Sequence, residues 1–510
     1  MQLVFSAGII LLVVIWGVTA PASLGEVFSQ LLGTISTNFG WLYLWVVLAL
    51  VSVAALLVFS RYGDLKLGGE DDEPEFSLVS WFAMLFAAGM GIGLVFWGVA
   101  EPISHFGAPP PGITPQTPEA ANAAMRYSFF HWGLHPWAAY SVVALAIAFF
   151  SFRRGNPALV SAATEALPWS WAPKISVLVN VLAIIATAFG VAASLGIGAL
   201  QINGGLNAVF GVPVSAGVQV GIIVVTTVLF LGSAVTGVSR GIKWLSNINL
   251  CLAGLLMLSV FLLGPTVAII DTFTTTLGAY ASEFVRMSLR TTPFRDSGWV
   301  GGWTVFYWAW WIAWSPFVGL FIARVSRGRT IREFILGTVF APTLAGFLWF
   351  SVFGGTALHM QIWEAVPLAD AVKADVATAL FVMFDAMPMG TLMSVVATVL
   401  VLVFFVTSGD SATLVLGIMS TGGREDPKAY VKIIWGLLIA GIAISLLLAG
   451  GVQAVQTATI VFALPFTLVI LLMVYSLWRA IRIEWREEQQ RERALRRRLR
   501  EIADASTPKP

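Results

Sequence analysis

Long apolar runs alternate with short polar connections along almost the whole chain. Each run holds about 20 mostly apolar residues, the length that an α-helix needs to cross the hydrocarbon core of a bilayer. The pattern predicts twelve membrane-spanning helices, near residues 3–21, 40–60, 78–98, 127–152, 173–200, 214–236, 244–270, 299–324, 334–357, 389–420, 430–450 and 453–479. The predicted fold class is therefore an all-α polytopic membrane protein.

Composition agrees with this pattern and excludes several other classes of protein. Of the 510 residues, 58% are hydrophobic and only 11% are charged, so a soluble domain could not bury the apolar surface. The single cysteine, Cys251, excludes an intramolecular disulfide, and the four histidines lack the spacing of a metal centre. No nucleophile and base stand together. We expect no enzyme activity, no cofactor and no nucleic-acid partner.

The first apolar run has two interpretations, and the charge distribution sets the orientation. Leu3 to Ala20 lacks the preceding Lys or Arg of a secretory signal, which favours a first transmembrane helix, although residues 19–22 also suit a cleavage site. With a cytoplasmic N-terminus, the inner loops and tail hold 24 Lys and Arg residues and the outer loops hold 5. The positive-inside rule then predicts a multi-pass protein of the cell (inner) membrane with both termini cytoplasmic.

Three segments outside the spans have distinct patterns. Residues 271–297 are too polar to cross the bilayer, and their apolar positions recur at helical spacing, which predicts an interfacial amphipathic helix. The proline-rich stretch 99–120 predicts an irregular outer cap. Residues 480–510 form a highly charged, helical tail on the cytoplasmic side. This tail either anchors the last span as a solvated end or senses lipid as a regulatory element.

Aromatic side chains concentrate in the middle of the eighth span. Residues 303–314 include five tryptophans, a tyrosine and a phenylalanine, whereas indole rings in membrane proteins normally collect at the interfaces. In the fourth span, Trp137 and Tyr140 share a helix face with Trp132 about one turn earlier, which offers a second aromatic wall. Two such walls can hold a quaternary ammonium group through cation–π attraction. For His131 and His135, anchoring at the interface is favoured over a proton relay.

Glycines interrupt the third span. Gly89, Gly91 and Gly93 stand at alternate positions, and each weakens a helix by about 1 kcal/mol relative to alanine. We expect the helix to unwind here, so that free backbone groups face a cavity where they can bind an ion or a polar substrate group. Close packing of helices through small residues is the alternative interpretation.

A polar patch lies inside the tenth span. Thr407 and Ser408 either hydrogen-bond to their own helix backbone or supply oxygen ligands for an alkali cation. Thr187 in the fifth span could add another oxygen. Asp410 is an intramembrane acid and therefore a functional candidate. Asp410 and Arg324 both follow helices that run inward, which suggests that they pair as an inner gate.

Four motifs in this order resemble the betaine/carnitine/choline transporter (BCCT) family over essentially all twelve spans. They are residues 89–93 with Glu101-Pro102, residues 131–140, residues 303–334 including Ser315-Pro316-Phe317-Val318-Gly319, and residues 407–411. The resemblance implies two peripheral helices (1–60) and a LeuT-type five-plus-five inverted repeat, with repeats at 78–270 and 299–479. It also implies alternating access around a midplane site and a homotrimer.

The resemblance further implies site residues. The substrate site would consist of Trp132, Trp137, Tyr140, Trp310, Trp311, Trp314, Gly91 and Gly93, with Phe317 closing the inward path. The sodium site would consist of backbone oxygens of Ala87, Met90 and Phe404 and the hydroxyls of Thr407 and Ser408. Sodium-coupled relatives place a second sodium between two threonines one turn apart in the fifth span. Here Thr187 is present but its partner position is Val191, which puts that second sodium in doubt.

Gly93 bears on the substrate. Choline carriers of the family tend to have aspartate at this position, so glycine favours a zwitterion such as glycine betaine over choline. The functional hypothesis is a sodium-coupled importer of a zwitterionic, quaternary-ammonium compatible solute. The alternatives within transport are a sodium-independent exchanger and a proton-coupled carrier of choline-, carnitine- or ectoine-type solutes. A channel or a membrane sensor is the alternative from another class.

Overall fold

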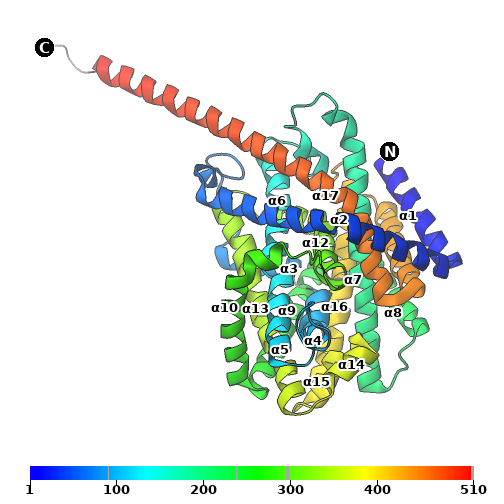
Figure 1. Cartoon of the computed structure of the whole chain (residues 1–510). Coiled ribbons are helices and arrows are strands. Elements are labelled where there is room, and N and C mark those ends of the chain that lie inside the picture. Colours follow the sequence, from blue (N-terminus) through cyan, green and yellow to red (C-terminus); the bar gives the residue numbers. More distant parts are fainter. Residues whose placement is uncertain (90, 237–238, 295–297, 507–510) are drawn as a thin grey trace.

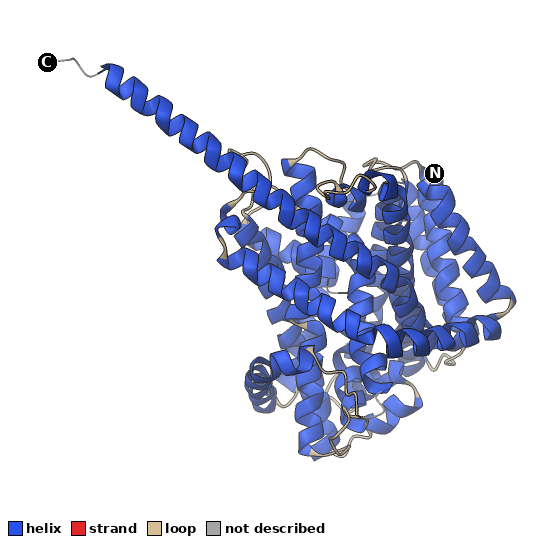
Figure 2. Ribbon diagram, turned by 45° about the horizontal axis from the view of Figure 1, so that its top comes forward, coloured by secondary structure: helices blue, strands red, loops and turns tan. Residues whose placement is uncertain are grey.

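The protein is a bundle of long helices, as the apolar pattern predicts. The computed structural model describes residues 1–506 except 90, 237–238 and 295–297. Within these residues, Figure 2 shows helices and loops without a strand. Ten helical segments of the described chain are long and apolar enough to cross a membrane. The chain is therefore an all-α polytopic membrane protein.

The first two predicted spans form one helical hairpin at the edge of the bundle. Helix α1 (Gln2–Thr19) ends at Ala20, and α2 (Pro21–Phe59) begins directly after it, with Pro21 in its first turn, where a missing N–H costs nothing. α2 is thus much longer than the predicted span 40–60. The Tyr43 hydroxyl on α2 donates to the carbonyl of Ile460, 2.7 Å away, and so ties this peripheral helix to α17.

The third span is broken where the glycines predict a break. Helix α3 (Leu78–Gly89) ends before Gly91, and α4 (Ile92–Gly107) begins after it, with Gly91 at φ −142° and ψ −148°. α4 continues to Gly107 with Pro102 inside it, so part of the predicted irregular cap at 99–120 is helical. The loop between α4 and α5 covers only residues 108–117.

The fourth span is also broken, which the sequence pattern did not predict. Helix α5 (Pro118–Trp132) stops at Gly133, and α6 (Leu134–Ala148) follows, with a π-helical turn at Phe149–Arg153. Pro136 has no N–H to donate to the carbonyl of Trp132, so the helical ladder cannot close across this point. A Cβ at Gly133 would lie 2.8 Å from the ring of Phe347, so only glycine lets α13 approach so closely.

The middle of the chain continues the bundle with α7 (Ser176–Phe210), α8 (Ala216–Thr236), α9 (Ser239–Leu263) and α10 (Thr266–Ser288). α10 corresponds to the predicted amphipathic helix, but it begins five residues earlier than predicted. Short 3₁₀ turns lie at Arg61–Asp64, Val160–Thr164 and Ala172–Ile175.

The second half contains the aromatic helix and the longest helix of the chain. Its elements are α11 (Gly298–Val300), a π-helical turn (Gly301–Val305), α12 (Phe306–Arg324), α13 (Ile331–Trp363), α14 (Leu368–Ala374), a 3₁₀ turn (Val376–Thr378), α15 (Ala379–Asp385), α16 (Gly390–Ser420) and α17 (Ala429–Ser506). α17 has non-helical backbone at Gly450 and Gly451, which separates the eleventh and twelfth predicted spans. Counting those two spans and the broken α3–α4 span, the described helices agree with the twelve predicted spans.

The interior is built around α12. This helix packs along α6 and α7, α13 packs on α4 and α6, and α7 runs beside α16 and α17. Beyond the bundle, α17 continues as the charged tail and projects away from the other helices in both views (Figures 1 and 2). The division of the spans into two inverted repeats stays a prediction.

Candidate functional site

Helix α12 brings its aromatic side chains into the protein interior. Trp310 and Trp311 are 2% and 6% exposed, and their rings stack with centroids 5.1 Å apart. Tyr307, one turn earlier, is fully buried and stacks on Trp311 at 5.9 Å. The eighth span therefore presents a continuous aromatic face to its neighbours, not to lipid.

The fourth span supplies the opposing face. Trp132, the last residue of α5, meets the Trp311 ring edge to face at 4.9 Å, and Tyr140 of α6 meets the same ring at 6.0 Å. Trp137 packs on Tyr140 at 5.5 Å. Rings from two spans far apart in the sequence thus converge on Trp311. These centroid distances are those of direct aromatic contact, so an onium group between Trp132 and Trp311 would require the rings to separate.

The break in the third span faces the same cluster. A Cβ at Gly93 would lie 2.7 Å from Cη2 of Trp310 and 3.1 Å from Cη2 of Trp132. At Gly91 a Cβ would meet open space. The first residues of α4 therefore lie against both aromatic walls. The Leu94 N–H bonds the Gly91 carbonyl at 3.1 Å, and the N–H groups before it fall in the first turn, where an α-helix supplies no acceptor of its own. The indole N–H of buried Trp310 also lacks a hydrogen-bond partner among the described residues.

Trp314 and Phe317 extend the aromatic face toward the end of α12 predicted to be cytoplasmic. The Trp314 indole donates to the carbonyl of Gly190 on α7 at 2.7 Å, and its ring packs against Phe317 at 5.2 Å. Phe317 is buried, at 8% exposure. This position is compatible with Phe317 closing the inward path from the predicted substrate site. That role stays a prediction.

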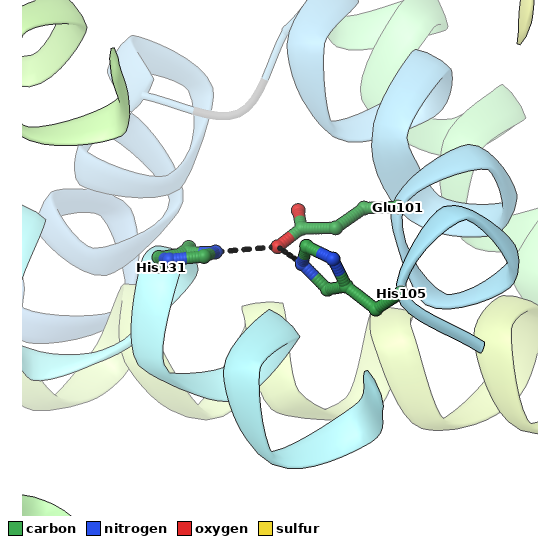
Figure 3. Close-up of side chains that lie close together, drawn as sticks. All are labelled: Glu101, His105 and His131. Atoms are coloured by element: carbon green, nitrogen blue, oxygen red, sulfur yellow. Dashed lines mark hydrogen bonds and ion pairs between the residues drawn. The ribbon is translucent and has the colours of Figure 1, made fainter. Parts of the chain in front are cut away.

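Glu101 is a site residue that the sequence interpretation missed. Its carboxylate is fully buried and accepts hydrogen bonds from four side chains: His105 (3.2 Å), His131 (2.7 Å), Trp132 (2.8 Å) and Tyr307 (2.5 Å). Figure 3 shows both imidazoles directed at one carboxylate oxygen. An acid next to the glycine-broken span was the available signal, but Glu101 was assigned to the outer loop 99–120.

The interfacial role predicted for His131 and His135 is wrong. Both are buried: His131 bonds Glu101 through Nδ1 and the Thr304 hydroxyl through Nε2 (3.1 Å), and His135 bonds the Ser288 hydroxyl at 2.8 Å. Helix α5 begins at Pro118, well before the predicted start of the span, so these histidines lie deeper than expected.

The carboxylate of Glu101 and the imidazoles of His105 and His131 are close enough together to hold a metal ion. The ligand atoms of Glu101, His105 and His131 lie within 4.8 Å of one another. Their mutual hydrogen bonds already use the same lone pairs and N–H groups, so the arrangement needs no metal to explain it.

Helix α16, which carries three of the predicted sodium ligands, packs on α4, the helix that begins after the break in the third span. A Cβ at Gly198 of α7 would touch both Ile92 of α4 (3.0 Å) and Phe405 of α16 (3.1 Å), so the tenth span runs past the start of α4. Thr407 bonds its own helix, at the carbonyls of Val403 (2.9 Å) and Phe404 (3.3 Å). Of the two interpretations of Thr407, the hydrogen bond to its own helix backbone is therefore the one that this structure shows.

The other predicted sodium ligands differ in how far the structure describes them. Ser408 is half-buried on α16. Ala87 lies in α3, and Met90 lies outside the described residues. Thr187 is fully buried, and its hydroxyl has no partner among the described residues. Val191, one turn further along α7, is equally buried and offers no oxygen.

The predicted pairing of Arg324 with Asp410 is wrong. Arg324, at the end of α12, lies 3.3 Å from Glu425, and both side chains are largely exposed. Asp410 is buried in α16, next to Gly409, whose missing side chain lets Phe230 of α8 pack closely. The two residues are at different depths, because Asp410 lies ten residues before the end of its helix whereas Arg324 ends its own.

The fold and the site define a polytopic membrane protein with broken helices around an aromatic centre, the architecture of a secondary transporter. Residues 2–486 match the family model described as "BCCT, betaine/carnitine/choline family transporter". The chain belongs to this family, and it is therefore a membrane transporter.

Individual relatives cover nearly the whole chain. It is 49% identical over 483 residues to the glycine betaine transporter OpuD of Bacillus subtilis, with 94% of each chain covered. It is 47% identical over 490 residues to the ectoine/hydroxyectoine transporter of Virgibacillus pantothenticus, with 96% of this chain and 97% of the relative covered. It is 45% identical over 459 residues to glycine betaine transporter 1 of Vibrio parahaemolyticus, with 88% and 86% covered.

Proposed function

We propose that the protein is a sodium-coupled importer of a zwitterionic quaternary-ammonium solute such as glycine betaine, working by alternating access. The observation that carries the proposal is the convergence of Trp132, Tyr140 and Trp311 from two spans beside the start of α4. Two of the relatives named above are glycine betaine transporters, which supports this substrate class.

The aromatic cluster suits the cationic end of the substrate. A methylated onium group has no N–H to donate, so a carboxylate would hold it only by charge, whereas aromatic faces attract its diffuse positive charge directly. Trp132, Trp311 and Tyr140 supply three such faces, and Trp137 backs Tyr140. Separation of these rings would admit the head group, and their closing around it would favour the occluded state.

The start of α4 suits the carboxylate end. A helix N-terminus carries free N–H groups and partial positive charge, and Gly91 and Gly93 expose that backbone beside the tryptophans. The indole N–H of Trp310, which has no partner within the described part of the chain, offers one more donor in the same cluster. Gly93 also leaves no space for an acidic side chain in this arrangement, which supports a zwitterion over choline. Ectoine is a second candidate, because the relative from Virgibacillus pantothenticus carries it.

Sodium would bind between the break in the third span and α16. Thr407 and Ser408 lie on the helix that passes Ile92, where an ion could bring hydroxyl and carbonyl oxygens together. A bound ion at this point would hold α4 and α16 in one relative position and so favour the substrate-binding state. One sodium is favoured over two, because the position one turn after Thr187 on α7 is Val191, where a second hydroxyl would be needed.

The membrane setting follows the charge distribution. Both termini would be cytoplasmic in the cell (inner) membrane, with α10 lying at the outer interface, and the transporter would assemble as a homotrimer. Sodium-independent exchange and proton coupling are the alternatives. An exchanger or proton carrier would transport at full rate without sodium.

Counterflow in proteoliposomes tests the proposal. Vesicles loaded with unlabelled glycine betaine should accumulate labelled glycine betaine in the presence of sodium, while choline-loaded vesicles should not. Net uptake should need a sodium gradient, with potassium as the matched control. Equal uptake with potassium would reject sodium coupling, and counterflow of choline alone would reject the zwitterion.

A further inference from the structure

We propose that Glu101 is a positioning residue of the substrate site: its carboxylate ties the aromatic wall of α5 to the aromatic wall of α12. The inference rests on the proposed function and adds to it a residue that would touch no substrate. It would fix how far apart the walls stand.

The contacts of Glu101 join three helices through one side chain. Oε2 accepts from the Trp132 indole of α5 at 2.8 Å and from the Tyr307 hydroxyl of α12 at 2.5 Å. Oε1 accepts from His105 of α4 at 3.2 Å and from His131 of α5 at 2.7 Å. An ionised carboxylate offers about four acceptor positions, and here four donors face it, so its orientation is fully determined.

Two histidines lie beside the carboxylate of Glu101. Among the described residues, the ion-pair partners within 4.0 Å of Glu101 are the two histidines, with no Lys or Arg. His131 faces an oxygen at each ring nitrogen, Glu101 at Nδ1 and the hydroxyl of Thr304 at Nε2. His105 has a partner only at Nε2. Both imidazoles therefore face one oxygen of the carboxylate, and His131 is held from two sides, by Glu101 and by Thr304.

The two residues on Oε2 are parts of the aromatic cluster. Trp132 contacts Trp311 with one face, and its far edge lies beside Gly93. Tyr307 stacks on Trp311 and meets Trp132 at 5.7 Å. One oxygen thus fixes the indole on one wall and the phenol that supports the other. Hydrogen bonds to a charged group are roughly twice as strong as those between neutral groups, enough to select one ring arrangement over another.

The aromatic ring of Tyr127 lies between Arg290 and the histidines that contact Glu101. Arg290 donates to the Tyr127 hydroxyl at 3.1 Å, and the Tyr127 ring lies against His105 and His131. It reaches Glu101 only through this aromatic layer. Removing the carboxylate should therefore free Trp132 and Tyr307 without bringing a new charged partner to them.

The test separates positioning from a general loss of structure. In proteoliposomes, Glu101→Ala should raise the KM for glycine betaine at least about tenfold, and Tyr307→Phe, which keeps the ring and removes one contact, should raise it about three- to tenfold. Glu101→Gln should fall between parent and alanine, because its carbonyl can still accept from Trp132 and Tyr307. At saturating glycine betaine, the sodium concentration for half-maximal uptake should stay within about twofold in all three variants.

Tyr43→Phe is the matched control, because it removes an equally buried tyrosine hydroxyl whose partner, Ile460, lies on α17. Its KM should equal that of the parent. If Glu101→Ala is not monodisperse after purification in detergent, the KM of Tyr307→Phe decides whether the inference holds. A KM within twofold of the parent for Tyr307→Phe and for any inserted Glu101 variant would overturn the inference. A parent that takes up no zwitterion at all would instead overturn the proposed function.

Discussion

Gly93 and Trp310 approach so closely that a Cβ on the glycine would lie 2.7 Å from Cη2 of the indole. This contact joins the start of α4 to the aromatic face of α12. Any side chain at position 93 must push the tryptophan away or tilt α4, so the packing of the aromatic cluster depends on the absence of one carbon atom.

Gly93→Ala should therefore raise the KM for the zwitterion by at least about threefold, through displacement of Trp310 and Trp132 in a packed interior. Gly107→Ala is the matched control, because Gly107 ends the same helix and a Cβ there meets open space. The measurement is initial uptake rate against substrate concentration. Equal KM values for the two variants would show that the contact does not set the site.

Trp311→Leu should weaken substrate binding by about tenfold or more, because a desolvated cation–π contact is worth about 2 kcal/mol and leucine has no ring to replace it. Binding to purified protein can be measured by calorimetry. Trp363→Leu, at a ring that is 76% exposed, provides the control and should bind like the parent. Unchanged affinity in Trp311→Leu would remove the aromatic cluster from the substrate site.

The double variant Thr407→Ala, Ser408→Ala should raise the sodium concentration for half-maximal uptake about tenfold, equivalent to about 1.4 kcal/mol of ion binding. Its maximal rate at saturating sodium should change much less. Thr421→Ala removes a hydroxyl that bonds the backbone of the same helix near its end, and it should have no effect on sodium dependence. An unchanged sodium curve in the double variant would place the ion elsewhere.

We expect Arg153 to hold the start of the charged tail of α17 against the rest of the protein. Its side chain is 7% exposed and lies 3.0 Å from Glu484 and 3.3 Å from Glu488 on α17. Arg153→Ala leaves both acids without this partner, so proteolysis within residues 479–506 should become at least about fivefold faster. Arg496→Ala breaks only a pair within the tail, with Glu492, and should leave the rate unchanged. Equal cleavage in both variants would show that Arg153 does not hold the tail.

The spans were predictable because apolar length and glycine spacing are local signals. The unwinding near Gly91 follows from three glycines in the third span, and the structure ends α3 and starts α4 there. The break at Gly133 was missed because one glycine is usually tolerated, and the missing N–H of Pro136 matters only when the preceding turn is helical. Reading residue 127 as the start of that span also put His131 too near the interface.

The contacts within the site were less predictable, because they join residues far apart in the chain. Glu101 was recognised only as part of a motif, and its four partners come from three helices. The Arg324–Asp410 pair was inferred from helix direction alone. Direction gives the side of the membrane but not the depth, and Arg324 meets Glu425 instead.

The break at Gly133 divides the fourth span into two parts that share α13 as a neighbour and otherwise pack on different helices. Trp132 ends the first part and is tied to Glu101, whereas Tyr140 belongs to the second part, which packs along α12. A small change of angle between these parts would alter the separation of Trp132 and Tyr140 while each stays with its own neighbours. A bend at this break would widen the cluster without the sliding of a whole helix, because the break lies inside one of its own walls.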